Sequence, residues 1–600
     1  MGKNSLGFES VLSDFSYASV HKDEVKKILC VVTYNKDIGS GHLKRMLRLL
    51  DSLGNQAHLY VPSPDAIRLI TLLGANISED QICSRPDQDG PWDLIVLDNY
   101  QTSIEEAAKW MNLGRVVALD EGGPARGILP YLIDTLPTLP SAGIPNEYET
   151  GYLDLPTFSG ERTYPPQRIL VTFGGIDQAQ LTERIGLMLD SHNIPSQQWC
   201  VTKGPFFLRT FAWPGIKILD NPNMREILPE FDLIITHFGI TAFEAVASGA
   251  NVVLLNPSQY HEKLSQIAGF PSLGVNNIHK NLQEDFLAYI TGKKTTRHWN
   301  HRVTLNPRKD LRERLLSLTG EKGGCPACPD NPKRFGKIVF RNKEKSYAEC
   351  PICGLIYQEA FTKIDVAYDK DYFFKDYEEQ YGRTYLDDFD HICQLSKLRI
   401  DRIVHKLKTD SRSLLEIGCA YGAFLKTAHE QGFQTLGVEI NDDAAHYVQS
   451  ELHLNVIKTS FPDEFQDEGK QYDVVTLWYV LEHFKNLDAA MKKISSLTKP
   501  GGIFAFSTPL GDGMTGTYSP KKFFKESPAD HYSIFTKKNI YKILARYGFK
   551  TIHIEITGVH PERKNIKILP GKKFYNFYKW WYKKRKLGDT FEVYAVKKEK

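Results

Sequence analysis

The sequence predicts a multidomain α/β protein built on parallel sheets, and two observations predict it. Short apolar runs alternate with longer amphipathic stretches, first over residues 26–260 and again from residue 411 to about 556. This strand-then-helix order is typical of βαβ units, in which a helix connects two parallel strands. The length of 600 residues also suggests roughly three or four domains.

A Pro-rich stretch around residues 136–166 divides the first alternating block into two halves. The runs KKILCVVTY, WDLIVLD and GRVVALD precede it, and the runs RILVTFGG, FDLIITH and NVVLLN follow it. We therefore expect two doubly wound, Rossmann-like lobes, over residues 26–150 and 165–295, that face each other across a cleft.

The overall composition excludes several classes of protein. The chain is 42% hydrophobic, yet no apolar run approaches the ~18 residues that a membrane helix needs. The first residues do not resemble a secretory signal, and nine cysteines are too few for a disulfide scaffold, so we expect a cytoplasmic protein. Lysine and arginine number 75 against 72 acidic residues, without a basic stripe before the last forty residues, so nucleic acid is not expected as a partner.

Four of the cysteines form two CxxC pairs, Cys325 with Cys328 and Cys350 with Cys353. Each CxxC turn points both sulfurs the same way, so two such turns can give four thiolates to one tetrahedral Zn²⁺. We expect a structural zinc ribbon over residues 322–358, because four protein ligands leave no position for a catalytic water. A redox pair and four unrelated core cysteines are the alternatives.

The block after the cysteines begins with a glycine motif at the end of a predicted strand. The run LLEIGCAYG ends in ExGxxxG, which places Glu416, Gly418 and Gly422 at a strand-to-helix turn. Glycines at such a turn let the backbone approach a ligand closely. The next predicted strand ends in Glu439, which is placed to accept hydrogen bonds from two ribose hydroxyls.

This ordered set, with YDVVTLWYVLEHF and KPGG further on, resembles the class I S-adenosylmethionine-dependent methyltransferases over roughly residues 320–556. The resemblance implies a Rossmann-like domain over residues 359–556, in which the ExGxxxG turn holds the methionine part of the cofactor and Glu439 holds its ribose. A nicotinamide-binding domain is the nearest alternative, but it expects GxGxxG. The order of a cysteine ribbon followed by this domain resembles a subgroup of these methyltransferases that acts on sugars or surface polysaccharides.

Methyl transfer to an oxygen or carbon requires that the proton of the acceptor be removed, so a base is expected near the methyl group. His483, just after the predicted fourth strand, and His531, in the segment HYSIFT, are the candidate catalytic residues. A structural, packed histidine is the alternative for each of them.

Glycine-rich loops also precede predicted helices in the N-terminal block. IGSGH follows the first strand, GGID follows RILVTF, and HFGIT opens a later helix. The N–H groups of such loops at a helix N-terminus form an anion site suited to a pyrophosphate. We therefore expect a phosphate-bearing ligand in the N-terminal block.

Together, IGSGHLKR, ILVTFGGIDQAQLT, FDLIITHFGITAFEAVASG and NPSQYHE resemble the sugar-nucleotide hydrolases of pseudaminic acid biosynthesis, which are similar to glycosyltransferases of the two-lobed GT-B fold. The resemblance implies that His42 is the base that activates water, that the glycine loops hold the diphosphate and that Glu244 binds the ribose. A helix-capping histidine is the alternative for His42. The implied substrate-binding residues are Gly39, Gly41, Gly174, Gly175, Thr241 and Glu244.

These motifs predict a bifunctional enzyme of surface-sugar biosynthesis. One half would bind an NDP-sugar and hydrolyse it or transfer from it, and the other would methylate a sugar or glycan with S-adenosylmethionine. The chain reads TYNKD where the hydrolases carry an Arg-x-Asp segment, and Ile240 where they carry serine. A non-catalytic binding module ahead of the methyltransferase is therefore the alternative.

The last segment, residues 557–600, interleaves cationic and aromatic residues, as in KKFYNFYKWWYKKRK. We expect a solvated basic tail or a final helix. Peripheral contact with a membrane surface or an anionic glycan lipid is the alternative.

Overall fold

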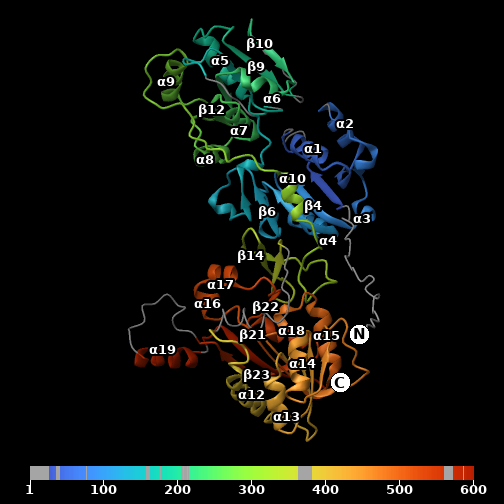
Figure 1. The fold of residues 1–600 in the computed structure, drawn as a ribbon. Helices are drawn as coiled ribbons and strands as arrows, with labels where there is room; N and C mark the ends of the chain where they lie inside the picture. The colour runs from blue at the N-terminus through green and yellow to red at the C-terminus, as the bar shows by residue number, and fades with distance from the viewer. Residues whose placement is uncertain are drawn as a thin grey trace, which may run out of the picture.

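The computed structural model describes residues 26–34, 41–73, 75, 77–156, 162–175, 177–204, 207, 213, 215–362, 382–559, 572–585 and 587–599. Four β-sheets lie in this part of the chain (Figure 1). Two are parallel throughout, one is antiparallel and one is mixed. The predicted α/β architecture with Rossmann-like sheets is confirmed.

The first lobe is a parallel sheet covered by helices on both faces. Along β1 (Ile28–Val32), residues 28, 30 and 32 pack into the core beneath α1 (Gly41–Leu53) and α2 (Pro64–Leu72), whereas residues 29 and 31 pack beneath α4 (Ile104–Leu113). Burial on both faces explains why its central strands are almost continuous apolar runs. The sheet order is β3 (Ile82–Cys83), β2 (Ala57–Tyr60), β1, β4 (Trp92–Asp98), β5 (Gly114–Leu119), β6 (Tyr131–Asp134) and β7 (Glu147–Tyr148).

The second lobe repeats this design with six parallel strands. Helices α5 (Leu181–Ser191) and α9 (Lys280–Ile290) cover one face, and α7 (Ile240–Ala247) and α8 (Gln259–Ala268) cover the other. The sheet order is β10 (Lys217–Asp220), β9 (Trp199–Lys203), β8 (Ile169–Val171), β11 (Leu233–Thr236), β12 (Asn251–Asn256) and β13 (Ser272–Val275).

The cysteine-bearing segment forms a small antiparallel sheet between the first lobe and the C-terminal domain (Figure 1). Phe335 and Phe361, which shortly precede and directly follow the first three strands of this sheet along the chain, are part of the hydrophobic core of the first lobe. The fourth strand of the sheet comes from the C-terminal domain, so the sheet joins the two. Its order is β14 (Lys337–Arg341), β15 (Lys345–Glu349), β16 (Ile356–Ala360) and β22 (Ser533–Ile534).

The C-terminal domain is a seven-stranded mixed sheet between two layers of helices. One layer holds α12 (Phe389–Val404), α13 (Ala423–Glu430) and α14 (Asp442–Ser450), and the other holds α15 (Leu487–Leu497) and α18 (Asn539–Arg546). The sheet order is β19 (Val456–Lys458), β18 (Gln434–Glu439), β17 (Ser413–Ile417), β20 (Tyr472–Trp478), β21 (Thr498–Pro509), β24 (Thr590–Lys597) and β23 (Phe549–Thr557).

This sheet extends beyond residue 556, where the sequence analysis ended the domain. β24 lies between β21 and β23 and pairs with both in antiparallel register. Its Glu592 is buried and accepts hydrogen bonds from Arg399 and Arg402 of α12 at 2.9 and 2.8 Å. The segment 557–600 is therefore only in part a tail: it forms the helix α19 (Lys572–Lys584) and then returns to complete the sheet.

Among the described residues, we find no helix that is both long and apolar enough to cross a membrane.

Candidate functional site

The turn after β17 has the backbone conformation that its glycines allow. Gly418 has φ of 70° and Gly422 has φ of 79°, a left-handed region that glycine adopts without strain. A Cβ on Gly418 would lie 2.6 Å from Cγ2 of Val480, and a Cβ on Gly422 would lie 2.9 Å from Cδ1 of Leu452. Glycine is therefore required at both positions, because the backbone is left-handed there and a side chain would collide with its neighbours.

Glu439 ends β18 and reaches this turn. Its Oε2 accepts the N–H of Ala420 at 2.7 Å, and its Oε1 accepts the N–H groups of Ile440 and Asn441 at 2.9 Å each. Burial raises the pKa of this carboxyl group. These bonds fix the carboxylate at the turn, and its predicted role toward the ribose hydroxyls stays a prediction.

Several buried polar atoms near the carboxyl ends of β17, β20 and β21 form no hydrogen bond with the described residues. Buried polar groups in folded proteins are nearly always paired, so this edge of the sheet is suited to a polar ligand. Glu416, Gly418, Gly422 and Glu439 are the residues that could hold a cofactor here. The unpaired atoms are Oε2 of Glu416, Nε1 of Trp478 and the hydroxyls of Ser507 and Ser533. The buried carboxylate of Glu482 lies beside the hydroxyl of Thr508 at the same edge.

The two predicted histidines lie side by side next to this edge. His483 follows β20, and His531 lies in the loop before β22. Their rings meet edge to face with centroids 4.7 Å apart, and Nδ1 of His483 lies 2.8 Å from Oδ2 of Asp530. Ligand atoms of Glu482, His483 and His531 all lie within 4.8 Å of one another. The cluster can therefore exchange a proton with a bound group, and its three donors could also accommodate one cation.

Burial dominates the protonation of two of the three groups in this cluster. It raises the pKa of Glu482 to about 7 and lowers the pKa of His531 to about 3. Burial opposes the charged form of His483 as well, but the hydrogen bond with Asp530 and the nearby Glu482 outweigh it and raise its pKa. His531 is therefore a neutral imidazole near pH 7, and His483 is held in one orientation by a carboxylate.

The antiparallel sheet fixes the loop that carries Asp530 and His531. The N–H of Gln358, in β16, donates to the carbonyl of Tyr532 at 3.0 Å, and its side-chain amide donates to the carbonyl of Ala529. The hydroxyl of Tyr347 donates to Oε1 of Gln358 at 2.7 Å and orients that amide. The position of His531 thus depends on the cysteine-bearing segment.

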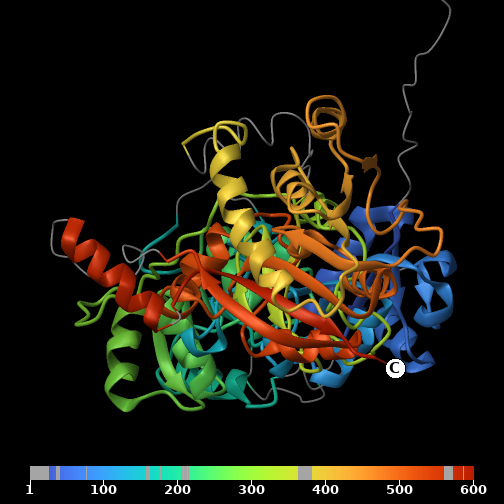
Figure 2. The same ribbon diagram turned by 90° about the horizontal axis from the view of Figure 1, so that it is seen from below.

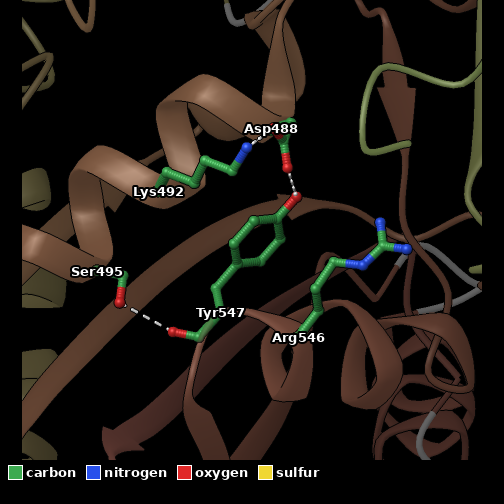
Figure 3. Close-up of a pocket in the computed structure, with 5 residues that line it drawn as sticks. All are labelled: Asp488, Lys492, Ser495, Arg546 and Tyr547. Carbon is green, nitrogen blue, oxygen red and sulfur yellow. Dashed lines mark hydrogen bonds and ion pairs between the residues drawn. The ribbon is translucent and has the colours of Figure 1, made fainter. Parts of the chain in front are cut away.

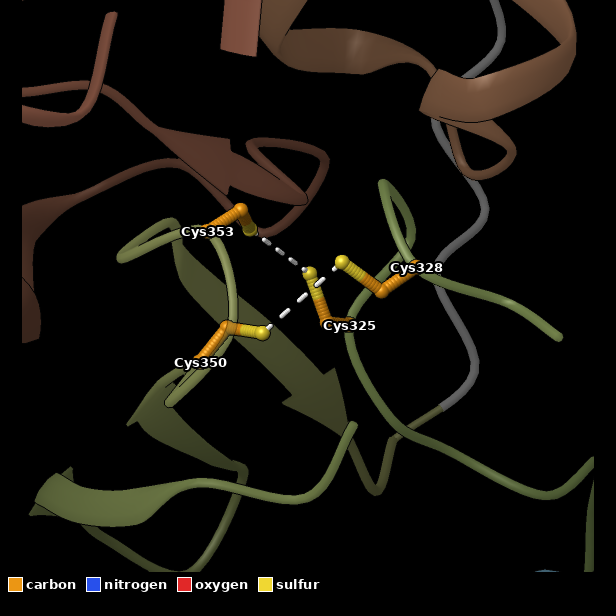
Figure 4. Close-up of side chains that lie close together, drawn as sticks. All are labelled: Cys325, Cys328, Cys350 and Cys353. Carbon is orange, nitrogen blue, oxygen red and sulfur yellow. Dashed lines mark hydrogen bonds between the residues drawn. The ribbon is translucent and has the colours of Figure 1, made fainter. Parts of the chain in front are cut away.

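The four predicted metal ligands converge, and all are buried and free of disulfides (Figure 4). The Sγ atoms of Cys325 and Cys353 lie 3.6 Å apart, and those of Cys328 and Cys350 lie 4.0 Å apart. Tetrahedral zinc with Zn–S bonds of about 2.3 Å separates its sulfur ligands by about 3.8 Å. The donor set and its spacing therefore fit one zinc ion.

The first cysteine turn is attached to helices α15 and α18 of the C-terminal domain, whose residues Asp488, Arg546 and Tyr547 are drawn in Figure 3. Arg546 donates to Sγ of Cys328 at 3.0 Å, and the N–H of Asp488 donates to the carbonyl of Pro326 at 3.0 Å. The hydroxyl of Tyr547 donates to Asp488 at 2.8 Å. The hollow in Figure 3 is lined by residues of this joint, among them Asp488, Arg546 and Tyr547.

In the first lobe, His42 belongs to a buried network of charges. Its Nδ1 lies 2.7 Å from Oδ1 of Asp98, the last residue of β4, and Nε of Arg45 donates to Oδ2 of Asp98 at 2.7 Å. Burial would raise the pKa of Asp98, but Arg45 and His42 lower it to about 2. Asp98 is thus a stable anion that orients the ring of His42 and directs its Nε2 away from the carboxylate.

The two lobes meet where α1 faces α7. Arg48 of α1 lies 3.6 Å from the carboxylate of Glu244 in α7, and a Cβ on Gly41 would lie 4.0 Å from Cδ1 of Ile240. Glu244 is buried, and burial raises its pKa. The structure therefore brings helix α1, which carries His42, and the helix of Glu244 to one interface.

The remaining predicted residues of the second lobe lie in two neighbouring turns. Gly174 and Gly175 follow β8, and a Cβ on Gly174 would lie 3.4 Å from Nε2 of His237. Thr241 is half-buried in the first turn of α7. Gly39 lies outside the described residues, so its predicted role stays a prediction.

Asp98, Arg45 and Asp530 were not among the residues predicted from the sequence. Asp98 ends a buried parallel strand, where ligand-facing polar residues are common, so the run WDLIVLD offered a signal. Asp530 directly precedes His531, but its partner is His483, and no local pattern joins residues that distant.

Comparison with known proteins identifies one part of the chain. Residues 390–554 match the family model described as a methyltransferase domain. Curated relatives include ubiquinone biosynthesis O-methyltransferases of Nitrosospira multiformis, 28% identical over 126 residues (20% of this chain, 53% of the relative), and of Vibrio atlanticus, 23% identical over 185 residues (29% and 77%). The chain spans about half the length of the first of these relatives.

Similar solved structures include an S-adenosylmethionine-dependent methyltransferase from Archaeoglobus fulgidus, 22% identical with a TM-score of 0.28, covering 37% of this chain and 98% of that one. Another is the magnesium protoporphyrin IX methyltransferase of Synechocystis PCC 6803, 15% identical with a TM-score of 0.27, covering 38% and 97%. The matched residues 390–554 include the ExGxxxG turn, Glu439 and both histidines. The C-terminal part of this chain carries a methyltransferase domain.

Proposed function

We propose that the C-terminal domain transfers a methyl group from S-adenosylmethionine to a hydroxyl oxygen of a sugar or glycan. The observation that carries this proposal is the polar edge of the sheet, where unpaired buried atoms lie next to the His483–Asp530 pair. The names of the curated relatives support oxygen as the acceptor atom. A sugar acceptor is supported by the cysteine ribbon in front of the domain and by the sugar-nucleotide motifs of the N-terminal lobes.

S-Adenosylmethionine, when bound, supplies a methyl group on a positively charged sulfur. Glu439 would accept a ribose hydroxyl, and the unpaired oxygen of Glu416 would accept from the amino group of the methionine part. His483 would take the proton of the acceptor hydroxyl as the oxygen bonds to the methyl carbon. A base is needed because a sugar hydroxyl is hardly ionised at neutral pH.

We expect Gly418→Ala to weaken the binding of S-adenosylhomocysteine at least tenfold in isothermal titration calorimetry. The new Cβ would meet Val480 at 2.6 Å and deform the turn that ends β17. Gly432→Ala is the matched control, because Gly432 also has a positive φ, 84°, but a Cβ there would meet nothing within 4 Å. If Gly418→Ala binds the product as tightly as the unchanged protein, the turn is not the cofactor site.

We also propose that the two N-terminal lobes bind an NDP-sugar between them. Separately, we propose that the four cysteines further along the chain hold a structural zinc ion. The contact of Arg48 with Glu244 supports a ligand site that uses both lobes. The His42–Asp98 pair favours hydrolysis over binding alone, because a module that only binds needs no imidazole oriented by a buried anion. Mass spectrometry of small molecules that copurify with the full chain would identify the nucleotide.

His42→Ala is expected to reduce the release of nucleotide from that NDP-sugar at least 100-fold, since the base that activates water is removed. Binding of the NDP-sugar by calorimetry and methyl transfer in the C-terminal domain are expected to stay within a fewfold of the unchanged protein. His58→Ala, in the same lobe, serves as control. Unchanged release in His42→Ala would instead support the non-catalytic module.

A further inference from the structure

Helix α19 (Lys572–Lys584) projects from the body of the C-terminal domain, as both overall views show (Figures 1 and 2). One side of the helix is anchored, since Tyr582 is 2% exposed and stacks with Tyr578. The other side carries Phe577 and Trp580, each 56% exposed. Two large apolar side chains are thus presented to solvent on an element that extends away from the fold.

The exposed aromatic residues lie within a cationic surface. Phe577 and Trp580 are three positions apart, so they are neighbours on the helix, and their rings lie 6.1 Å apart. Lys584 lies one turn further along the same side, with its Nζ 5.3 Å from the ring of Trp580. Lys583, three positions from Trp580, and Lys579, one turn before Lys583, are also exposed and border them. We call these five residues the α19 face.

The charge of the segment restricts what can cover this face. Residues 572–585 contain six Lys or Arg and no Asp or Glu. A second copy of the same helix would bring like charges together, which disfavours self-association through this face. Alternating aromatic and cationic side chains suit a surface that is negatively charged outside and apolar beneath.

We propose that the α19 face docks on the surface of an anionic lipid bilayer. Tryptophan and phenylalanine would enter the boundary between headgroups and acyl chains, while the lysines remain with the anionic headgroups. The helix would lie on the membrane and not cross it. This placement would hold the methyltransferase domain against a membrane, where a lipid-linked acceptor is within reach.

The test is sedimentation of the full chain with vesicles of phosphatidylcholine alone and with 30% phosphatidylglycerol. The chain is expected to bind only the anionic vesicles, with a blue shift of tryptophan fluorescence, and high salt is expected to weaken binding. F577A/W580A and K579E/K583E/K584E are each expected to weaken binding at least tenfold. The first is expected to abolish the blue shift.

Matched controls alter similar side chains elsewhere in the domain. Tyr541→Ala removes an aromatic residue that is 52% exposed on α18, and K521E/K522E/K525E reverses three exposed lysines on α17 (Pro520–Glu526). Both controls should bind vesicles normally. The proposal is overturned if the unchanged chain ignores anionic vesicles, or if F577A/W580A binds as well as the controls. Binding of RNA that depends on the lysines but not on the aromatic pair would indicate a nucleic-acid partner instead.

Discussion

Replacing His483 by alanine is expected to lower the rate of methyl transfer about 10²–10⁴-fold, the contribution typical of a positioned general base. His483 adjoins the polar sheet edge, and Asp530 lies 2.8 Å from its Nδ1 and fixes the orientation of the ring. Affinity for S-adenosylhomocysteine should change little, because the cofactor residues lie on β17 and β18. His429→Ala, on the exposed side of α13, is the control and should keep full activity. A rate for His483→Ala close to that of the control would exclude the base.

The pH dependence of methyl transfer in Asp530→Asn tests whether Asp530 acts on the protonation of His483 or supports only the local structure. The Asp530 carboxylate raises the pKa of His483 because it stabilises the imidazolium, and the active base is the neutral ring. Activity of the unchanged protein should therefore rise as pH passes this raised pKa. In Asp530→Asn the rise should move to lower pH, while the maximum rate falls.

Treatment with EDTA followed by Mg²⁺ tests whether Glu482, His483 and His531 hold a cation. Loss of methyl transfer with EDTA and its recovery with Mg²⁺ would indicate a bound cation.

Local patterns in the sequence predicted the parts of the site that are set by backbone geometry. The ExGxxxG motif requires two left-handed glycines, and the structure has both, at Gly418 and Gly422. The two CxxC spacings predicted four converging sulfurs, because each turn fixes the direction of its own pair. The two glycines, and the two cysteines of each pair, are within a few positions of one another, whereas the meeting of the two pairs joins residues 22 and 28 positions apart.

Parts of the structure that depend on contacts between distant segments were not predictable in this way. β24 follows a cationic aromatic helix and was assigned to a tail, yet it lies inside the sheet because β21 and β23 offer it two unpaired edges. Asp98 and Arg45 form their network across 53 positions of sequence. The bonds of Glu439 to Ala420, Ile440 and Asn441 likewise exist only once the turn has folded.

The cysteine ribbon connects the first lobe with the methyltransferase site. The hydroxyl of Ser346 donates to the carbonyl of Pro130 in the first lobe at 2.6 Å. The adjacent Tyr347 orients Gln358, which holds the loop of His531 through Tyr532 and Ala529. Hydrogen bonds therefore run from the first lobe through β15 and β16 to Glu482, His483 and His531, which we call the candidate base cluster. We expect the ribbon to be required for methyl transfer even though its sulfurs are not at the polar sheet edge.

Cys325→Ser should have the largest effect on stability of any of these substitutions, because structural zinc contributes about 10–16 kcal/mol of apparent binding free energy to the folding of zinc-finger peptides. Zinc measured by atomic absorption should fall from one per chain to near zero, and the melting temperature should fall by at least about 10 °C. Methyl transfer should be lost with it, because β16 can no longer hold the loop of His531. Cys200→Ser, a buried thiol of the second lobe, should keep its zinc and its activity.

Gln358→Ala tests whether activity depends on the position of the His531 loop when zinc is still bound. The change leaves the four sulfurs in place but removes the amide that donates to Ala529 and accepts from Tyr347. Zinc content and binding of S-adenosylhomocysteine should stay unchanged, while the rate of methyl transfer falls about tenfold, since a buried hydrogen bond of this kind is worth about 1–1.5 kcal/mol. A normal rate in Gln358→Ala, with activity lost in Cys325→Ser, would mean that zinc supports the fold alone and that the ribbon does not position the candidate base cluster.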